Sequence, residues 1–427
     1  MTPFFINSNI CVSKADVTDL STFMRSVCGN TGNSYITYAL VKEICPTIQK
    51  LNHIQNIYTY DFSTQDKDID FINNCCSHVF FILQDQIRIS ESYDLKLPYD
   101  LIIQFLKRIK KPIIIAGLGA NSFDGYDPWL YTKLDSALIY FLKALSDRTR
   151  EIGVRGNYTQ EVLQQIGINN TRVIGCPSFF EMGRNRKKIE KPSLHQNLKI
   201  AASLTGVPVS FLKETKAGIF LQDCLPLEKE VIKLIAFKEQ GNWSFLLNQI
   251  GPILCNHFYI FSNIEEWKKK LSAYDFFVGL RVHGAICALN SGIPALIMNR
   301  DSRAREMSEF LGIPWNPELL NNLSINNIYD FCSYDDMNSR YETLYDNFSD
   351  FLSRNDVSLF DNTKTETNTL RLFQPSLVLN NLQQYKVRTN FFKHWVKKQL
   401  IRFLSHITFG SLKNKLRNIY REKKNGN

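Results

Sequence analysis

The chain has 427 residues, 44% hydrophobic and 22% charged, which is typical of a globular protein with two or three domains. No apolar run reaches the roughly 18–20 residues of a membrane-spanning helix, and the N-terminus lacks the pattern of a signal peptide. Twelve of the 51 Lys and Arg residues but one of the 41 Asp and Glu residues lie in residues 386–427, so this tail carries +11 and the rest of the chain −1.

The ten cysteines are scattered along the chain, several of them inside apolar stretches. Their spacing matches no metal-ligand motif, and Cys75 and Cys76 are adjacent. This usage indicates buried free thiols in a reducing cytoplasm and predicts that the protein holds no metal.

The first half of the chain alternates helix and strand signals. Apolar spacing predicts helices over 32–50, 101–109, 129–145 and 159–166. Short apolar runs predict buried strands over 78–83, 112–117, 151–155 and 173–175. This alternation is typical of βαβ units around a mostly parallel sheet.

A polar, basic stretch at 183–197 fits a linker, and a second alternating series follows it. Strands are expected over 198–204, 257–261, 276–280 and 294–298, and helices over 228–237, 264–273, 284–290 and 302–311. The chain is therefore predicted to form two Rossmann-like α/β domains, over 1–185 and 195–385, that face a ligand-binding cleft, followed by the tail at 386–427.

An unusual turn follows the predicted strand at 276–280. Arg281 and His283 stand where an apolar helix begins, although the positive end of a helix disfavours a cation. A bound anion would remove this conflict, because Arg281 could bind an oxyanion, Gly284 would let the backbone approach it, and His283 could transfer a proton. Alternatively, Arg281 pairs with a carboxylate and His283 caps the helix.

A second charged turn follows the next predicted strand. Asp301 can cap the helix there, which places Arg303, Arg305 and Glu306 in the first helical turn. Two arginine-bearing turns at one sheet edge favour an anionic ligand, whereas a solvated charged turn remains the alternative.

The segment Gly279–Pro314 resembles the signature of the polysaccharide pyruvyl transferase family. That signature has an Arg-x-His after a hydrophobic strand, then Ala-x-x-x-Gly-x-Pro, Asp-x-Arg-x-x-Glu and Leu-Gly. These features are present here as Arg281 and His283, Ala288 to Gly292 and Pro294, Asp301, Arg303 and Glu306, and Leu311-Gly312.

Earlier segments resemble the family in the same order: the loop at 29–33, the strand and glycine loop at 112–121, and the stretch at 154–178. The chain also departs from the family pattern. The family commonly has Asp where Asn33 stands here, and often where Gly156 stands. Many members carry an Arg near the end of the first strand of the second domain; here that stretch reads Ser203-Leu204-Thr205, for which Lys213 or Lys216 is the suggested substitute.

The resemblance implies a fold like that of the two-domain GT-B glycosyltransferases. It also implies transfer of pyruvate from phosphoenolpyruvate to a sugar as a ketal, with no cofactor or metal required. Arg281 and either Arg303 or Arg305 would bind the phosphate and carboxylate of the donor, and His283 would supply the proton. The acceptor would be a surface polysaccharide or its lipid-linked precursor.

Side chains of the first domain are expected to face the same cleft. Asn30, Asn33 and Asn121 would bind sugar hydroxyls, and Arg155, which follows a strand, would reach the site. Ordinary turn roles for the asparagines and a surface salt bridge for Arg155 are the alternatives. Two other functions stay open: a glycosyltransferase that uses a nucleotide sugar, and a non-catalytic glycan-binding protein.

The tail contains an aromatic and basic stretch. Between Phe391 and Ile407, apolar side chains recur at helical spacing with lysines between them. This pattern predicts an amphipathic helix that contacts an anionic membrane surface, consistent with a lipid-linked acceptor. A helix packed on the body is the alternative, and nucleic-acid binding is disfavoured because no recognition module accompanies the charge.

Overall fold

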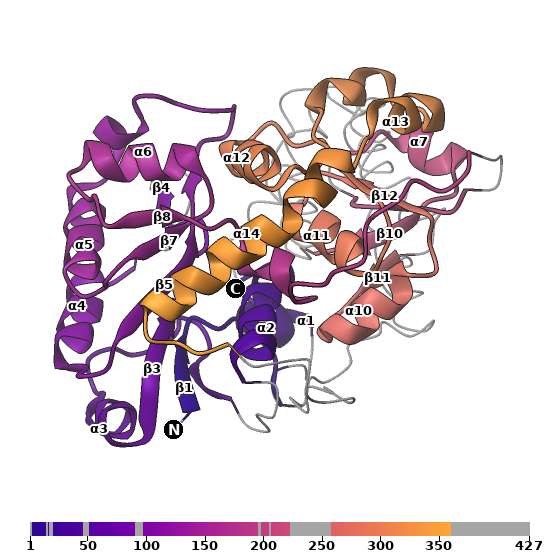
Figure 1. Ribbon diagram of the computed structural model, residues 1–427. Helices are drawn as coiled ribbons and strands as arrows, with labels where there is room; N and C mark the ends of the chain where they lie inside the picture. Colours follow the sequence, from indigo (N-terminus) through magenta and orange to yellow (C-terminus); the bar gives the residue numbers. More distant parts are fainter. Residues whose placement is uncertain are drawn as a thin grey trace, which may run out of the picture. The chain divides into compact units, whose positions relative to one another are not determined.

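The computed structural model divides into two units, Met1–Leu377 and Val378–Asn427. It describes residues 2–13, 16, 20–45, 51–89, 97–194, 198–204, 206–222 and 258–359. The predicted helix at 228–237 and the predicted basic tail at 386–427 lie outside these residues. The described part of the chain contains two larger parallel sheets with helices beside them (Figure 1).

The first sheet has six strands in the order β2-β1-β3-β5-β7-β8, and every pairing in it is parallel. The strands are β1 (Thr2–Ile6), β2 (Asn52–Ile54), β3 (Cys76–Phe81), β5 (Ile113–Leu118), β7 (Ile152–Val154) and β8 (Thr171–Val173). The helices of this part are α1 (Leu20–Ser26), α2 (Gly32–Ile44), α3 (Asp66–Cys75), α4 (Tyr99–Arg108), α5 (Ser136–Ser146) and α6 (Asn157–Gln165). A separate short pair joins β4 (Ile87–Arg88) to β6 (Ala120–Asn121).

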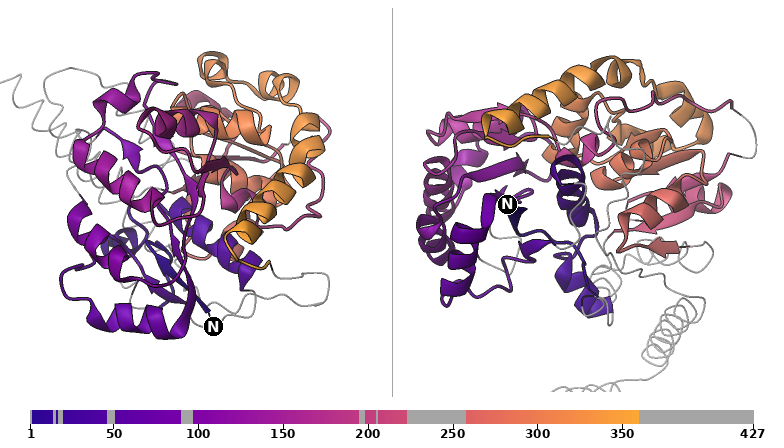
Figure 2. Two further views of the ribbon diagram at one scale, coloured as in Figure 1. Left: turned by 60° about the vertical axis from the view of Figure 1, so that its left-hand side comes forward. Right: turned by 60° about the horizontal axis from the view of Figure 1, so that its bottom comes forward.

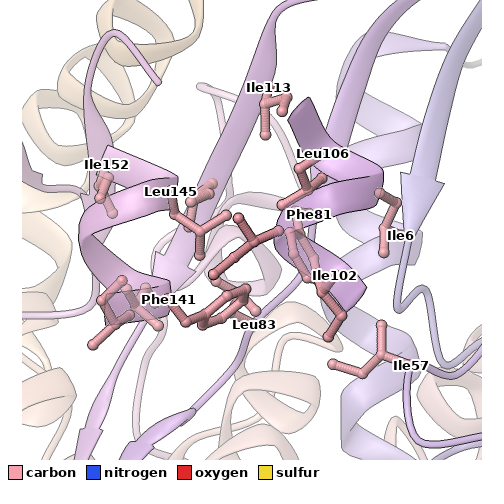
Figure 3. Close-up of a cluster of buried hydrophobic side chains, with 14 of the residues drawn as sticks. Ile6, Ile57, Phe81, Leu83, Ile102, Leu106, Ile113, Phe141, Leu145 and Ile152 are labelled. Atoms are coloured by element: carbon pink, nitrogen blue, oxygen red, sulfur yellow. The ribbon is translucent and has the colours of Figure 1, made fainter. Parts of the chain in front are cut away.

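The strands of this sheet are continuously apolar because helices cover the sheet. All six residues of β5 are buried, as parallel strands covered by helices require. On one face, Ile102 and Leu106 of α4 and Phe141 and Leu145 of α5 pack with Phe81 of β3 (Figure 3). The two residues of each helix are four apart, so they share the face that meets the sheet.

The second sheet has five strands in the order β11-β10-β9-β12-β13, again all parallel. They are β9 (Ile200–Ala202), β10 (Gly218–Leu221), β11 (Phe258–Ile260), β12 (Phe276–Gly279) and β13 (Ala295–Ile297). The helices are α7 (Val209–Glu214), α10 (Ile264–Leu271), α11 (Val282–Asn290), α12 (Ser302–Leu311), α13 (Ile325–Phe331) and α14 (Asp335–Arg354). The prediction of an α/β fold with two Rossmann-like parallel sheets is confirmed.

One predicted helix is wrong in its extent. The apolar pattern at 129–145 indicated a continuous helix, but the structure has a 3-10 turn at Leu130–Lys133, extended backbone at Leu134, and then α5. Asp135 causes the restart, because its side chain accepts a hydrogen bond from the backbone N–H of Ala137 as an N-cap. Strands β1, β2 and β10 and the short pair β4 and β6 have no counterpart among the predicted strands.

Among the contacts that tie the parts of the Met1–Leu377 unit together are those of helix α14 and of Glu181. Helix α14 follows the second sheet in the chain yet lies along elements of the first part (Figure 2). Tyr345 donates to Glu43 (2.6 Å), and Asn347 donates to the carbonyl of Val173 (2.8 Å). None of the described helices is both long and apolar enough to cross a bilayer.

The second of these contacts is formed by the carboxylate of Glu181, whose side chain is fully buried. It forms ion pairs with Lys42 of α2 and Lys268 of α10, the latter at 2.8 Å, and accepts a hydrogen bond from Tyr35 (3.1 Å). Burial alone would raise the pKa of Glu181, but the two lysines outweigh burial and hold that pKa below its ordinary value.

Candidate active site

The carboxyl ends of strands from both sheets bring polar side chains together, where ligands of parallel α/β sheets bind. Asp85 lies beyond the end of β3 and Arg303 beyond the end of β13, and they form an ion pair of 2.6 Å. His283 follows β12 and contacts Cys176, which follows β8, at 3.5 Å between Nε2 and Sγ. We call the following set the strand-end cluster: Asp85, Arg155, Cys176, Gln222, His283 and Arg303.

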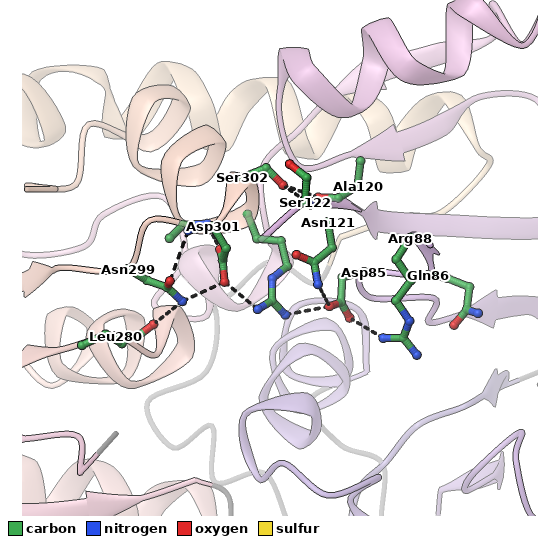
Figure 4. Close-up of polar contacts among 12 residues, drawn as sticks. Asp85, Gln86, Arg88, Ala120, Asn121, Ser122, Leu280, Asn299, Asp301 and Ser302 are labelled. Carbon is green, nitrogen blue, oxygen red and sulfur yellow. Dashed lines mark hydrogen bonds and ion pairs between the residues drawn. The ribbon is translucent and has the colours of Figure 1, made fainter. Parts of the chain in front are cut away.

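Arg303 is held between two carboxylates. Its Nη1 contacts Asp85 and its Nη2 contacts Asp301 at 2.7 Å, and Asn121 donates a further hydrogen bond to Asp85 (3.2 Å) (Figure 4). Burial would raise the pKa of Asp85, but Arg303, Arg88 and Arg155 outweigh it and hold that pKa far below its ordinary value. Asp85 therefore stays ionised and fixes the position of the guanidinium.

Asp301 links this ion pair to the start of α12. It is the N-cap of the helix, with its Oδ1 accepting from the N–H of Ala304 at 2.8 Å. Its Oδ2 accepts from Asn299 at 2.7 Å (Figure 4). The hydroxyl of the next residue, Ser302, donates to the carbonyl of Ala120 (3.1 Å), so the helix start is bonded to the first part of the chain.

His283 lies in the first turn of α11 with its ring buried. Burial, and then the positive charges of Arg155 and Arg303, lower the pKa of His283 to about 3. The imidazole is therefore neutral at pH 7 in the absence of a ligand. Cys176, beside its Nε2, is itself 3.0 Å from the hydroxyl of Ser178.

Arg155 is the most deeply buried cation of the cluster, with 3% of its surface exposed. Its side chain passes over Gly119, where a Cβ would come within 2.8 Å of its Cδ. Within the described part of the chain, its Nε and Nη2 have no hydrogen-bond partner. This burial excludes the surface salt bridge considered for Arg155, and two unpaired guanidinium nitrogens inside a protein indicate a site for an anion.

Glu306 serves a different purpose from the arginines beside it. Its buried carboxyl accepts hydrogen bonds from the N–H (3.1 Å) and the hydroxyl (2.8 Å) of Thr159, in the first turn of α6. Burial raises the pKa of Glu306 to about 8. A Cβ at Gly156 would lie 2.9 Å from this carboxylate, so the glycine leaves room for the Glu306 side chain.

Arg281 is the N-cap residue of α11, and its carbonyl accepts from the N–H groups of Gly284 (3.0 Å) and Ala285 (3.2 Å). Gly284 is packed closely, since a Cβ there would come within 2.4 Å of the Gln222 amide and 2.7 Å of the ring of Phe277. The structure thus places Arg281 and Gly284 at the helix start that carries His283.

The structure does not bring Arg305 to the other arginines. Its guanidinium pairs with Glu309 at 2.8 Å and lies 4.2 Å from the ring centre of Tyr126. With about 40% of its side chain exposed, Arg305 has the contacts of a surface residue.

The three asparagines expected to bind sugar differ in their contacts. Asn30 accepts from the N–H of Gly32 (2.8 Å), and Asn33 donates to the carbonyl of Val27 (3.2 Å), so both stabilise the loop before α2. Asn121 lies within the Asp85 network, and its Oδ1 has no partner among the described residues.

Three members of the strand-end cluster were not predicted from the sequence. Asp85 lies two residues after the end of a predicted strand, and that position was a usable signal. Gln222 follows β10, whose run was not recognised as a strand, and Cys176 carried no motif of its own. Where the family often has an Arg, the hydroxyl of Ser203 accepts from the N–H of Leu280 (3.0 Å).

Among the described residues, no group of three or more His, Cys, Asp or Glu side chains could hold a metal ion.

The geometry is that of an α/β protein with a buried, arginine-rich site between strand ends of two parallel sheets. Residues 30–302 match the model of the family described as polysaccharide pyruvyl transferase. The chain belongs to the polysaccharide pyruvyl transferase family.

No curated protein matches the chain. Solved structures similar to it include the UDP-GlcNAc 2-epimerase of Methanocaldococcus jannaschii, with 8% identity and a TM-score of 0.41 over 83% of this chain and 100% of that one. A putative UDP-N-acetylglucosamine 2-epimerase from Listeria monocytogenes has 10% identity and a TM-score of 0.42 over 88% and 99%. The wall teichoic acid polymerase TagF (H444N variant) has 11% identity and a TM-score of 0.34 over 93% and 90%.

Proposed function

We propose that the protein transfers the pyruvyl group of phosphoenolpyruvate to two hydroxyls of a glycan, forming a ketal and releasing phosphate. The observation that carries this proposal is the buried guanidinium of Arg155, with two nitrogens unpaired in the described part of the chain, beside the buried ring of His283. A doubly anionic donor would complete this environment.

The charges of the site fit such a donor. Three guanidinium groups, those of Arg88, Arg155 and Arg303, lie beside two carboxylates, Asp85 and Asp301. Glu306 is largely uncharged at neutral pH because burial raises its pKa to about 8. The excess of positive charge matches a phosphate and a carboxylate. Guanidinium groups bind both groups through paired hydrogen bonds, which makes arginine better suited to this donor than lysine.

The reaction needs one acid and two attacking hydroxyls. Protonation of C3 of the donor makes a methyl group while the first sugar hydroxyl forms a bond to C2. The second hydroxyl then forms a bond to C2 as the bond from C2 to the phosphate oxygen breaks. One hydroxyl proton replaces the proton given to C3, and the other leaves with phosphate, so the enzyme is restored.

His283 is the proposed acid. Burial and two nearby arginines lower its pKa to about 3, and the charge of a bound donor would offset those arginines and raise it. Its Nε2 contacts Cys176, and its Nδ1 lies toward Gly32, where a Cβ would be 2.9 Å away. We therefore assign the transferred proton to Nδ1.

We further propose a glycan of a surface polysaccharide, or its lipid-linked precursor, as the acceptor. The basic residues of the tail at 386–427 would attract anionic lipid at the cytoplasmic face of the membrane, by about 1 kcal/mol each. Vesicle sedimentation of the full chain and of a chain ending at residue 385 tests this: the full chain should bind phosphatidylglycerol vesicles and the shortened one should not.

The activity is tested by incubating the protein with phosphoenolpyruvate and a panel of methyl pyranosides. Phosphate release together with a new ketal detected by mass spectrometry would support the proposal. His283→Asn should abolish both signals. Turnover of UDP- or GDP-sugars in place of phosphoenolpyruvate would instead support a nucleotide-sugar glycosyltransferase.

A further inference from the structure

Gln222 is a buried side chain to which the proposed function assigns no role. It follows β10 directly, 3% of its surface is exposed, and its carbonyl accepts from the N–H of Thr31 at 3.0 Å. Its side-chain Oε1 and Nε2 are both buried, and both lack a hydrogen-bond partner among the described residues. Buried polar groups without a hydrogen-bond partner are rare because they are costly, so the amide indicates a polar ligand.

The amide lies between the starts of two helices that come from different parts of the chain. A Cβ on Gly32, the first residue of α2, would lie 2.8 Å from Oε1 of Gln222 and 2.9 Å from Nδ1 of His283. A Cβ on Gly284, in the first turn of α11, would lie 2.4 Å from Nε2 of Gln222. The two glycines leave the space that the amide occupies, and they place its oxygen on the same side of Gly32 as the histidine.

The chemistry of the amide distinguishes between ligands. A phosphate or a carboxylate accepts hydrogen bonds, so it would pair with Nε2 and leave Oε1 unpaired. A hydroxyl both donates and accepts, so a pair of sugar hydroxyls can pair with both ends. The proposed function already assigns the anionic donor to the arginines whose charge acts on His283, which leaves the amide for a neutral diol.

We propose that Gln222 binds the diol of the glycan acceptor, an inference that rests on the proposed function. Oε1 accepts from the hydroxyl that attacks C2 of the donor, on the side where Nδ1 of His283 lies. Nε2 donates to the second hydroxyl, which attacks in the later step. Gln222 is then a positioning residue of the acceptor, and it comes from the second sheet, where the sequence had placed the donor site alone.

The test compares Gln222→Met, which keeps the length of the side chain and removes the amide, with Gln222→Glu, which keeps the acceptor oxygen. Gln65→Met is the matched control, because Gln65 is also buried, bonds to Tyr60 and lies at the start of α3. Binding of methyl β-galactopyranoside, β-glucopyranoside and β-mannopyranoside is measured by saturation-transfer NMR without any donor. Phosphoenolpyruvate binding is measured separately by thermal shift.

We expect Gln222→Met to weaken pyranoside binding about tenfold to a hundredfold, as the loss of two hydrogen bonds requires. The thermal shift caused by phosphoenolpyruvate should stay as in the wild type. The pyranoside affinity of Gln222→Glu should lie between those of Gln222→Met and the wild type. Gln65→Met should bind both ligands normally. In turnover, Gln222→Met should raise KM for the pyranoside while KM for phosphoenolpyruvate is unchanged.

Three results would overturn the assignment. The first is Gln222→Met that binds pyranosides as the wild type does. The second is loss of the phosphoenolpyruvate shift with pyranoside binding intact, which would place the amide in the donor site. The third is no pyranoside binding by the wild type. Because the pyranoside measurement uses no donor, a failure of phosphoenolpyruvate to bind would contradict the proposed function and not this assignment.

Discussion

His283 combines a position suited to proton transfer with a pKa unsuited to it until the donor binds. Burial and the charges of Arg155 and Arg303 keep the imidazole neutral at pH 7. Replacing His283 with Asn removes the titrating group while keeping a polar side chain of similar size. We expect this variant to bind phosphoenolpyruvate within a few-fold of the wild type and to lose turnover by about two orders of magnitude or more. A parallel loss of binding, measured by calorimetry, would contradict the assigned role.

The same environment predicts that binding of the donor takes up a proton. The pKa of His283 starts at about 3 and rises when anionic charge arrives beside the arginines, so the complex holds a proton that the free protein lacks at pH 7. Affinity for phosphoenolpyruvate should therefore fall by about a few-fold in total as pH rises from 7 to 8.5. Calorimetry in two buffers of different ionisation enthalpy counts the protons, and His283→Asn should show neither the uptake nor the slope.

At this scale, the sequence predicted the residues whose local position was unusual. Arg281 and His283 stood out because a cation at a helix start conflicts with the helix dipole. Asp85 and Gln222 were not found, because their roles depend on partners in the other half of the chain, and a single strand end does not reveal which strand ends meet it. Arg305 looked equivalent to Arg303 in the sequence, but two residues that are two positions apart on a helix point about 200° apart around its axis.

Helix α12 is bonded to helix α6 through Glu306, and this contact has a pH dependence. The pKa of Glu306 is raised by burial to about 8 in the folded protein, so its contribution to stability is complete below its ordinary pKa and is lost as pH rises through 8. Glu43, also raised by burial, to about 7, contributes in the same direction at lower pH.

Between pH 7 and 8 the free energy of unfolding of the wild type should fall by up to about 1.4 kcal/mol because of Glu306. Glu306→Gln cannot ionise, so its stability should be flatter over this window, as measured by urea denaturation. Glu309→Gln, an exposed position on the same helix, is the control and should keep the slope of the wild type. An unchanged slope in Glu306→Gln would contradict the assignment.

At the level of elements, hydrophobic patterning predicted the helices with one apolar face and the strands that are apolar throughout. The strands at 112–117 and 294–298 were found as apolar runs because helices cover the parallel sheets. The break at Asp135 was missed because the apolar spacing continues across it, and the capping hydrogen bond that restarts the helix leaves no trace in hydrophobicity.

Across the whole Met1–Leu377 unit, the Glu181 contact joins α2 beside the first sheet to α10 beside the second. Glu181→Leu leaves Lys42 and Lys268 without this carboxylate, and loss of one partner of a buried ion pair costs about 3–5 kcal/mol. We expect a large fall in the free energy of unfolding, measured by urea denaturation. Lys268→Met combined with Glu181→Leu should recover part of the loss, because it removes one stranded charge.

Asp66→Asn is the control for this prediction, since Asp66 pairs with Arg108 at the surface, where 82% of its side chain is exposed. Such pairs contribute little, so the variant should stay within about 0.5 kcal/mol of the wild type. Equal effects of Asp66→Asn and Glu181→Leu would show that the buried carboxylate has no special role.

The arrangement of the whole unit was only partly predictable. Two series of alternating strands and helices predicted the two sheets, but the return of α14 onto residues of the first part depends on contacts more than 170 positions apart in the chain. The hydrophobic face of α14 indicates that one side of the helix is buried, but it does not show which part of the protein covers that side.

The central claim is that the buried arginines bind phosphoenolpyruvate, and calorimetric titration of the wild type and of Arg155→Gln tests it most directly. We predict that the wild type binds phosphoenolpyruvate and that Arg155→Gln, which retains a polar side chain but no charge, binds about tenfold to a hundredfold more weakly. UDP- and GDP-sugars should give no heat of binding with either protein. A wild type that binds a nucleotide sugar and not phosphoenolpyruvate, or equal affinity in Arg155→Gln, would contradict the account.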